Sequence, residues 1–245
     1  MPKIVIIAAL EQELRPLIKN WPATAVQHEG RDFTFYESNY AVAVCSGIGY
    51  EAGRRAAEAA VVNYSPELLI SAGIAGALVP DLHVGETVFP SIVIDARDSS
   101  RHETAIQNTR LADSPLARTI LVSSPVIAGT SQKQKLGSSY RAHAVDMEGA
   151  AVAHTAQLHG LPFLAIKSIS DELDFELPEM AMFIRDGRFQ TAGFAFHIAV
   201  RPWLWLRVAR LARNTWLAAE NLCSWLRESA MTNTIIPGTI SRHQS

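Results

Sequence analysis

The sequence predicts an α/β protein with three αβα layers, built on a central mixed, largely parallel sheet and followed by a C-terminal amphipathic helix. Continuous β-branched runs, such as residues 3–9 (KIVIIAA), have the length and composition of strands covered on both faces. Helix-favouring runs alternate with these strands, as is typical of a layered fold with parallel strands. The 245 residues are 48% hydrophobic and 19% charged, which is enough to bury a core without disulfides or a structural metal.

The first half of the chain is expected to alternate strands, helices and one hairpin. In order, these are a strand at 3–9, a helix at 11–20, a hairpin at 32–36 and 40–46, a helix at 51–63 and a strand at 67–72. Glycine segments follow the strands that end near Cys45 and Ala72. Pro22 ends the first helix, because proline cannot continue a helical hydrogen-bond ladder.

The second half predicts the remaining strands and a long surface segment. The expected elements are strands at 86–94, 119–123, 142–145 and 161–169, a polar stretch over the surface at 95–117, and a helix at 147–159 that stops at Gly160. No linker or repeat divides the chain. We therefore expect a catalytic domain at 1–195, a helical extension of the same domain at 196–230 and a flexible tail at 231–245.

The segment from about 194 to 230 differs in composition from the rest of the chain. At 100° per residue, its leucines fall on one face with Trp205 and Trp216, whereas Arg207, Arg210 and Arg213 fall opposite. A terminal helix packed on the core explains this pattern. A basic, tryptophan-bearing helix at a membrane interface, or beside the entrance of a lipid-like substrate, explains it as well.

Composition excludes several classes of function. A net charge of −2 gives no general attraction to nucleic acid, so we expect no nucleic-acid partner. Cys45 and Cys223 have no Cys or His at ligand spacing, which predicts neither a metal site nor a disulfide framework. The sequence indicates no cofactor. It contains no signal peptide and no apolar run long enough to span a bilayer, so we expect a cytoplasmic protein, membrane-peripheral if the C-terminal helix binds lipid.

Two glycine segments lie where strands are expected to end. Gly47 and Gly49 precede a predicted helix, where backbone N–H groups can bind an anion. The segment lacks the remaining residues of a dinucleotide or phosphate fingerprint, so a tight turn explains it equally. The same two interpretations apply to residues 73–76.

Four acidic residues lie near expected strand ends or helix starts. Asp146 is placed to cap a helix, and Glu148 lies in its first turn, where a carboxylate is favoured. Asp171 ends a buried strand, where a carboxylate is costly unless it is paired or transfers protons. Glu13 follows the first strand and is explained equally by an exposed helix position.

In this order, the segments resemble a known family. They are KIVIIAALEQEL, SGIGYEAG, ISAGIAGAL with HVGE, AVDMEGAAVA and LPFLAIKSISDELD. They are similar to the purine and uridine phosphorylase superfamily, and most of all to its methylthioadenosine/S-adenosylhomocysteine nucleosidase branch. The resemblance extends from residue 1 to about 174. It implies cleavage of the N-glycosidic bond of an adenine nucleoside that carries a 5′ substituent, in a homodimer or larger oligomer.

The resemblance also implies a role for each matching residue. Asp171 matches the acid that protonates N7 of the leaving purine, and Glu13 matches the carboxylate that activates water. Glu148 matches the acid that binds the ribose hydroxyls, and Met147 the thioether under the sugar. The remaining matches are Ser170, which positions Asp171, the base and ribose pocket of Ile74, Ala75 and Gly76, and the segment around Ile127 beside the base and 5′ group.

Some features depart from the nucleosidase pattern. No arginine stands in the 71–74 segment, where the phosphorylases hold phosphate, so water is favoured over phosphate as the acceptor. The C-terminal third is similar to the hopanoid-associated phosphorylase branch, whose substrate is thought to be an adenosylated triterpenoid. Phosphorolysis of such a nucleoside is therefore an alternative to hydrolysis. A non-catalytic nucleoside-binding module is a third, although it needs neither Glu13 nor Asp171.

Overall fold

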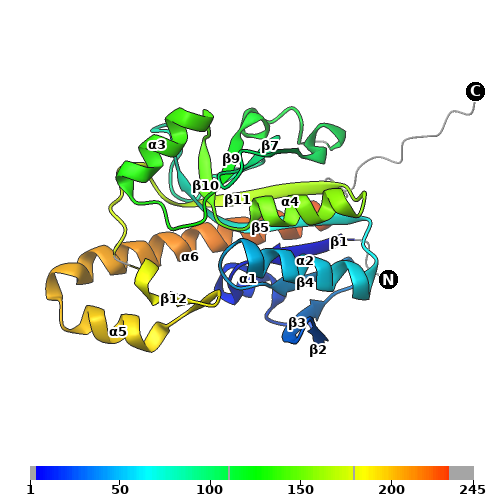
Figure 1. Ribbon diagram of the computed structural model, residues 1–245, viewed down its shortest axis with the longest axis horizontal. Helices are drawn as coiled ribbons and strands as arrows, with labels where there is room; N and C mark the ends of the chain where they lie inside the picture. Colours follow the sequence, from blue (N-terminus) through cyan, green and yellow to red (C-terminus); the bar gives the residue numbers. More distant parts are fainter. Residues whose placement is uncertain (1–3, 110, 179, 232–245) are drawn as a thin grey trace, which may run out of the picture.

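The centre of the molecule is a mixed eleven-stranded sheet, seen in a computed structural model that describes residues 4–109, 111–178 and 180–231 (Figure 1). Strand β1 (Ile4–Ala8) lies between β4 (Ala41–Cys45) and β5 (Leu68–Ala77) and runs parallel to both. Strand β11 (Phe163–Asp171) runs parallel to β5 along most of its length. These strands are almost wholly buried, as their continuous apolar composition predicts.

The outer strands add antiparallel pairings to this parallel centre. They are β2 (Ala23–His28), β3 (Arg31–Glu37), β6 (Thr87–Val88), β7 (Ile92–Asp95), β8 (Arg101–Glu103), β9 (Ile120–Ser123) and β10 (Ala144–Asp146). The β2–β3–β4 meander is antiparallel, and β10 joins the end of β5 antiparallel before the parallel series β10–β9–β7. The prediction of a mixed sheet with a parallel centre is confirmed.

Helices cover both faces of the sheet. They are α1 (Glu11–Ile18), α2 (Tyr50–Tyr64), α3 (Thr130–Tyr140), α4 (Gly149–Leu158), α5 (Thr191–Ala199) and α6 (Pro202–Met231). Helices α2 and α4 pack in front of the sheet in the view of Figure 1, and the C-terminal half of α6 packs behind it beside α1. Helix α5, the start of α6 and the small hairpin of β12 (Ile184–Arg185) and β13 (Arg188–Phe189) project from one end.

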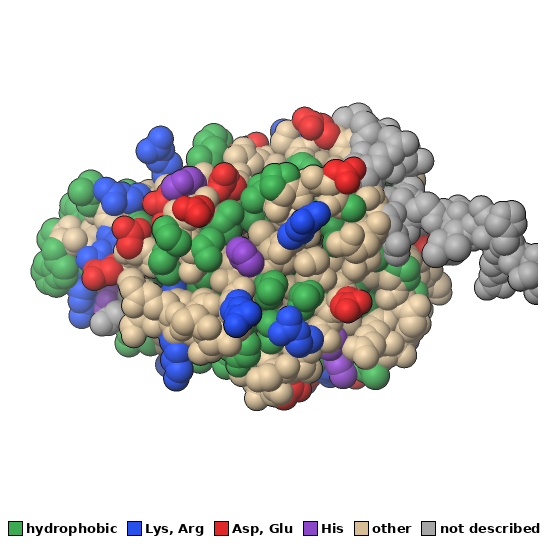
Figure 2. Space-filling model, turned by 90° about the horizontal axis from the view of Figure 1, so that it is seen from above, with side chains coloured by type: hydrophobic (Ala, Val, Ile, Leu, Met, Phe, Trp, Pro, Cys, Tyr) green, Lys and Arg blue, Asp and Glu red, His purple; other side chains and the backbone are tan. Residues whose placement is uncertain are grey.

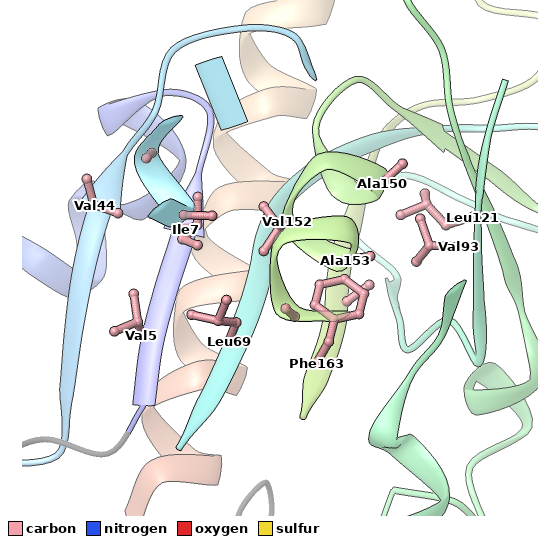
Figure 3. Packing of buried hydrophobic residues seen from close by; sticks show 14 of the residues in the cluster. Val5, Ile7, Val44, Leu69, Val93, Leu121, Ala150, Val152, Ala153 and Phe163 are labelled. Atoms are coloured by element: carbon pink, nitrogen blue, oxygen red, sulfur yellow. The ribbon is translucent and has the colours of Figure 1, made fainter. Parts of the chain in front are cut away.

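Alternation along the strands divides the core between the two layers of helices. Val5 and Ile7 of β1 lie with Leu69 of β5 and Val44 of β4 on one face and pack toward Val152 of α4 (Figure 3). The intervening β1 residues pack on the opposite face against α1 and α6. The three αβα layers are therefore confirmed.

Several elements were not predicted from sequence, among them β2, β8, α3 and the β12–β13 hairpin. Strands β2 and β8 are mostly exposed and polar, and α3 (TSQKQKLGSSY) has only Leu136 as a large apolar buried residue. Without an apolar period, these segments carry little signal. Strand β8 and two short 3₁₀ helices, Ala105–Asn108 and Pro115–Arg118, lie in the stretch predicted to be irregular.

Two predicted strand boundaries are wrong. The strand expected at 86–94 is two strands, β6 and β7, with Pro90 between them, because proline cannot donate a ladder hydrogen bond. The segment 73–76 is not a turn but the continuation of β5. Gly73 and Gly76 of this segment leave room for the side chains of Glu13 and Asp171, which lie directly over them.

The single helix expected from about 194 to 230 is two helices. Helix α5 ends at Ala199 and α6 begins at Pro202. Proline is favoured at the first position of a helix and disfavours helical geometry in the residue before it, so Pro202 starts a new helix. The tail expected at 231–245 lies, beyond Met231, outside the described residues, and the boundaries at 195 and 230 stay predictions.

Candidate active site

A cavity of about 1010 Å³ lies at the carboxyl ends of the central strands, between the sheet, α1, α6 and the β12–β13 hairpin. It is lined by every residue to which the sequence assigns a catalytic or substrate-binding role, namely Glu13, Ile74, Ala75, Gly76, Ile127, Met147, Glu148, Ser170 and Asp171. Strand ends at one edge of an open α/β sheet are where ligands bind in such folds. Gly47 and Gly49 do not line the cavity, although Ile48 between them does.

Glu13 is buried in the first turn of α1. Its Oε2 accepts N–H groups from Ala9 at 3.1 Å and Leu10 at 3.2 Å, so the carboxylate binds the backbone where β1 passes into the helix. A Cβ at Gly73 would lie 3.1 Å from this oxygen, which therefore sits directly over β5. Burial raises the pKa of Glu13 to about 7, although the charge of Lys167 and the two backbone hydrogen bonds oppose the rise.

Glu148 is the N-cap residue immediately before α4, and it contacts the start of α2. Its Oε1 accepts the N–H of Gly49 at 2.6 Å, so the anion bound at the predicted glycine site is a carboxylate of the protein itself. Gly53 permits this approach, because a Cβ there would lie 3.3 Å from Glu148 Cβ. Burial, and then the neighbouring charge of Asp146, raise the pKa of Glu148 to about 8.

The prediction that Asp146 is the N-cap of α4 is wrong, because that residue is Glu148, but the Asp146 carboxylate accepts a backbone N–H of the first turn and also holds a buried cation. Its Oδ2 accepts the N–H of Gly149 at 2.8 Å, and its Oδ1 accepts the hydroxyl of Ser123 at 2.5 Å. Lys167 of β11 lies 2.8 Å from Oδ2 and donates to Ser71 Oγ at 3.0 Å. Sequence reasoning missed Lys167, although a lysine inside the apolar run LPFLAIKSI signals a buried partner.

Lys167 balances the charge at this end of the cavity. Burial acts to lower its pKa, but the carboxylates of Asp146, Glu148 and Glu13 outweigh burial and raise it. Its ammonium is 2% exposed and is surrounded by acidic groups on three elements. The positive charge of Lys167 therefore lowers the free-energy cost of burying these three carboxylates at one end of the cavity.

Asp171 ends β11, and its carboxylate contacts one hydroxyl donor and one ammonium group. Ser170 Oγ donates to Oδ1 at 2.6 Å, and Lys133 of α3 forms an ion pair with Oδ2. Lys133 also donates to the carbonyl oxygen of Glu172 at 2.6 Å and is fully buried. Sequence reasoning missed Lys133; its one signal is its position three residues before the buried Leu136, on the same face of the helix.

The opposite wall of the cavity is apolar. It is formed by side chains from the segment 177–194 and from α6, namely Leu177, Met180, Ile184, Phe189, Phe194, Val208, Leu211 and Trp216. The cavity thus has a polar end, with the acidic residues and their lysines, and an apolar end. Among residues 4–109, 111–178 and 180–231, no group of acidic, His or Cys side chains is placed to hold a metal ion.

Comparison with known proteins is consistent with this fold and these segments. The family model of the phosphorylase superfamily matches residues 3–119 and 105–193. The chain belongs to this superfamily and is one of its enzymes.

Its relatives include 5′-methylthioadenosine/S-adenosylhomocysteine nucleosidases and an aminodeoxyfutalosine nucleosidase. The 5′-methylthioadenosine/S-adenosylhomocysteine nucleosidase of Buchnera aphidicola is 28% identical over 203 residues, which are 70% of this chain and 79% of the relative. The aminodeoxyfutalosine nucleosidase of Campylobacter jejuni is 23% identical over 208 residues, 72% of this chain and 91% of the relative. The structure of the Arabidopsis thaliana 5′-methylthioadenosine nucleosidase matches with a TM-score of 0.70 at 17% identity, covering 96% of this chain and 97% of the other.

Proposed function

We propose that the protein hydrolyses the N-glycosidic bond of an adenine nucleoside and releases the base. One observation carries this proposal: two buried carboxylates, Glu13 and Asp171, lie over two glycines of the same strand. A Cβ at Gly73 would meet Glu13, and a Cβ at Gly76 would lie 3.0 Å from Asp171 Oδ2. Both carboxylates also line the same cavity of about 1010 Å³, which has room for a nucleoside between them.

The acids have separate roles in this reaction. Asp171 protonates N7 of the purine, so that the base leaves neutral, and Ser170 positions its carboxylate. Glu13 takes a proton from the attacking water, and a pKa of about 7 suits a base that works near neutral pH. Glu148 accepts the ribose hydroxyls in place of the Gly49 N–H, above Met147.

The remaining lining residues complete the pocket around the substrate. Ile74, Ala75 and Gly76 form the wall beside the base and ribose. Ile127 lies in the segment that reaches toward the base and the 5′ group. These roles are supported by the position of each residue on the wall of the same cavity.

Charge favours water over phosphate as the acceptor. At the polar end, Lys133 and Lys167 are each paired with a carboxylate, whereas Glu13 and Glu148 add further acidic groups. A phosphate dianion is repelled there, while the positive charge that develops on the ribosyl ring is stabilised. Phosphorolysis is the alternative and requires a rearrangement of these ion pairs.

A non-catalytic nucleoside-binding role is less well supported. Burying Glu13 with a pKa of about 7 destabilises the fold when it ionises. Binding alone does not need that arrangement, whereas proton transfer does.

We propose further that the substrate carries an apolar 5′ substituent. The cavity is at the upper end of the 300–1,000 Å³ range of typical ligand sites, and its far wall is apolar. A methylthio or longer alkylthio group fits this wall, as does the triterpenoid that the C-terminal resemblance implies. The triterpenoid is therefore one example of the apolar 5′ substituents that we propose for the substrate.

We propose two partners besides the substrate. Exposed aromatic and aliphatic side chains, including Phe196, Trp203 and Leu206, project on α5 and the start of α6 beside arginines, which suits peripheral contact with a lipid surface. Figure 2 shows hydrophobic, Lys and Arg side chains gathered at that end. No helix within 4–109, 111–178 and 180–231 has the length and apolarity needed to cross a membrane. A homodimer or larger oligomer, implied by the family resemblance, stays a prediction.

Adenine release tests the proposed reaction. The purified chain is incubated with 5′-methylthioadenosine, S-adenosylhomocysteine and 5′-decylthioadenosine, with and without phosphate. We expect equal rates with and without phosphate, free ribosyl product, and the highest kcat/KM for the decylthio substrate. Release that requires phosphate supports phosphorolysis, and no release from any substrate supports the binding module.

A further inference from the structure

The lysine beside the candidate acid is the least expected feature of the site. Lys133 is 0% exposed, forms an ion pair with Asp171 and donates to the carbonyl oxygens of Glu172 at 2.6 Å and Asp171 at 3.4 Å. A Cβ at Gly76 would lie 3.0 Å from Asp171 Oδ2 and 3.1 Å from Lys133 Cε, so strand and pair fit closely together. The Lys133 ammonium is thus fixed against Asp171 Oδ2, the carboxylate oxygen that lies over Gly76.

We propose that Lys133 supplies the proton that neutralises the leaving base, with Asp171 passing it on. This inference rests on the nucleosidase function proposed for the same site. In the structure, Ser170 donates to Asp171 Oδ1 and the Lys133 ammonium forms an ion pair with Oδ2, so Lys133 is the proton-bearing group in contact with the acid. Asp171 is then a relay between Lys133 and N7 of the purine.

A positioning role alone does not require an ammonium here. Taking an ammonium out of water costs several kcal/mol, and a neutral amide donor of similar length holds a carboxylate at lower cost. The other charged groups do not replace it. Glu13, Asp146 and Glu148 are acceptors on the same cavity, and Lys167 is bound to Asp146.

Outside the cavity wall, the side chain of Glu172 contacts His83 at 3.3 Å. The side chains of His83 and Glu172 are largely exposed, so neither is positioned to donate a proton to the purine. Of the ammonium groups at the polar end, only Lys133 therefore contacts the acid.

The step balances without any further reactant. The C1′–N9 bond breaks, and its electron pair goes to the purine. A proton moves from Lys133 Nζ to Asp171 Oδ2 and on to N7, which leaves a neutral amine and an ionised carboxylate. Water adds to C1′ and gives its proton to Glu13. After product release, Glu13 loses that proton to solvent and Lys133 regains one, so one water is consumed.

The ratio of wild-type to Lys133→Gln kcat/KM, measured from pH 5 to pH 9, tests the proposal. An ammonium keeps its proton up to about pH 10, whereas an aspartic acid ordinarily loses its proton near pH 4. In the variant only Asp171 can donate, so we expect the ratio to grow with pH, from less than about 10 at pH 5 to at least 100 at pH 8. The contribution of Glu13 cancels in this ratio.

A ratio that is constant across the pH range overturns the proposal, because it indicates a structural role. Lys167→Gln is the matched control, as it removes the other buried lysine. Its loss lets the pKa values of Glu13 and Glu148 rise, so the ratio of wild-type to Lys167→Gln kcat/KM is expected to fall with pH, opposite to the ratio for Lys133→Gln.

Two further measurements keep the test decisive if Lys133→Gln does not fold, which circular dichroism and thermal unfolding report. Lys133→Arg keeps the charge but has a guanidinium that does not give up its proton; a wild-type profile in this variant overturns the proposal. Wild-type activity itself should persist above pH 9, and a decline that begins below pH 8 overturns it too. A wild-type chain without any nucleosidase activity refutes the proposed function instead.

Discussion

Glu13 occupies a position in which a carboxylate responds to pH near neutrality. Its oxygen accepts two backbone N–H groups, and burial raises its pKa to about 7. As the base of the reaction it must be ionised, so kcat/KM is expected to rise with pH through about 7. Glu13→Gln keeps the size of the side chain but cannot accept the proton of water. We expect kcat/KM to fall by about 10²–10⁴ and the step near pH 7 to disappear.

Glu11→Gln is the matched control for this prediction. Glu11 lies in the same first turn of α1 and is exposed, so both the rate and the pH profile should stay as in the wild type. Retention of more than a tenth of the wild-type rate by Glu13→Gln would show that another group activates water.

Among the elements, strand β5 forms the floor under both candidate acids, because Glu13 and Asp171 each lie over one of its glycines. Gly76→Ala adds a methyl group 3.0 Å from Asp171 Oδ2 and 3.1 Å from Lys133 Cε, so this pair must shift. We expect kcat to fall at least tenfold, with a loss of about 1–3 kcal/mol in the free energy of unfolding. Gly129→Ala, where a Cβ meets nothing within 4 Å, should leave both nearly unchanged. Equal kcat values for the two variants would contradict the crowding over β5.

The projecting helices offer a second prediction at this scale. Residues 180–216 carry six arginines and one aspartate, and although Arg207 pairs with the neighbouring Glu176, the segment keeps a net positive charge that suits an anionic lipid surface. A second copy of the same segment is repelled by it. We expect binding to vesicles that contain phosphatidylglycerol, weaker binding to phosphatidylcholine alone, and loss of binding in Trp203→Ser/Leu206→Ser.

Vesicle sedimentation measures this binding, with Leu158→Ser as control. Leu158 is also an exposed leucine, 65% accessible, but it lies on α4 away from the projecting end. Wild-type protein that stays in the supernatant with anionic vesicles refutes the lipid contact. Concentration-dependent self-association without vesicles would assign the surface to a second copy.

At the scale of the whole molecule, the parts with a strong apolar pattern were predictable from sequence. Strands β1, β4 and β11 were expected because their side chains are apolar on both faces. The exposed β2 and the polar α3 were not, because their positions are decided by neighbours far along the chain. Local pattern therefore describes the centre of this fold better than its edges.

The candidate site residues that belong to sequence motifs could be predicted from sequence. The lysines that form ion pairs with them could not. The DMEG and SISD segments led to Glu148 and Asp171, which lie on one cavity. Lys133 and Lys167 were missed because the identity of an ion-pair partner depends on the tertiary fold. In the sequence, nothing separates the buried Lys133 from the exposed Lys135 two residues later, except the position of each on the helix.

The two glycines of β5 have a consequence for how this enzyme can diversify. Glu13 and Asp171 each lie against a glycine of a strand that is buried on both sides, so changes in surface loops do not alter this contact. The apolar wall comes instead from residues 177–216, which join the body at one end. Bond cleavage and substrate choice thus reside in separate parts of the chain. Under the proposed function, the projecting helices can change to suit another 5′ substituent without moving the residues that lie over β5.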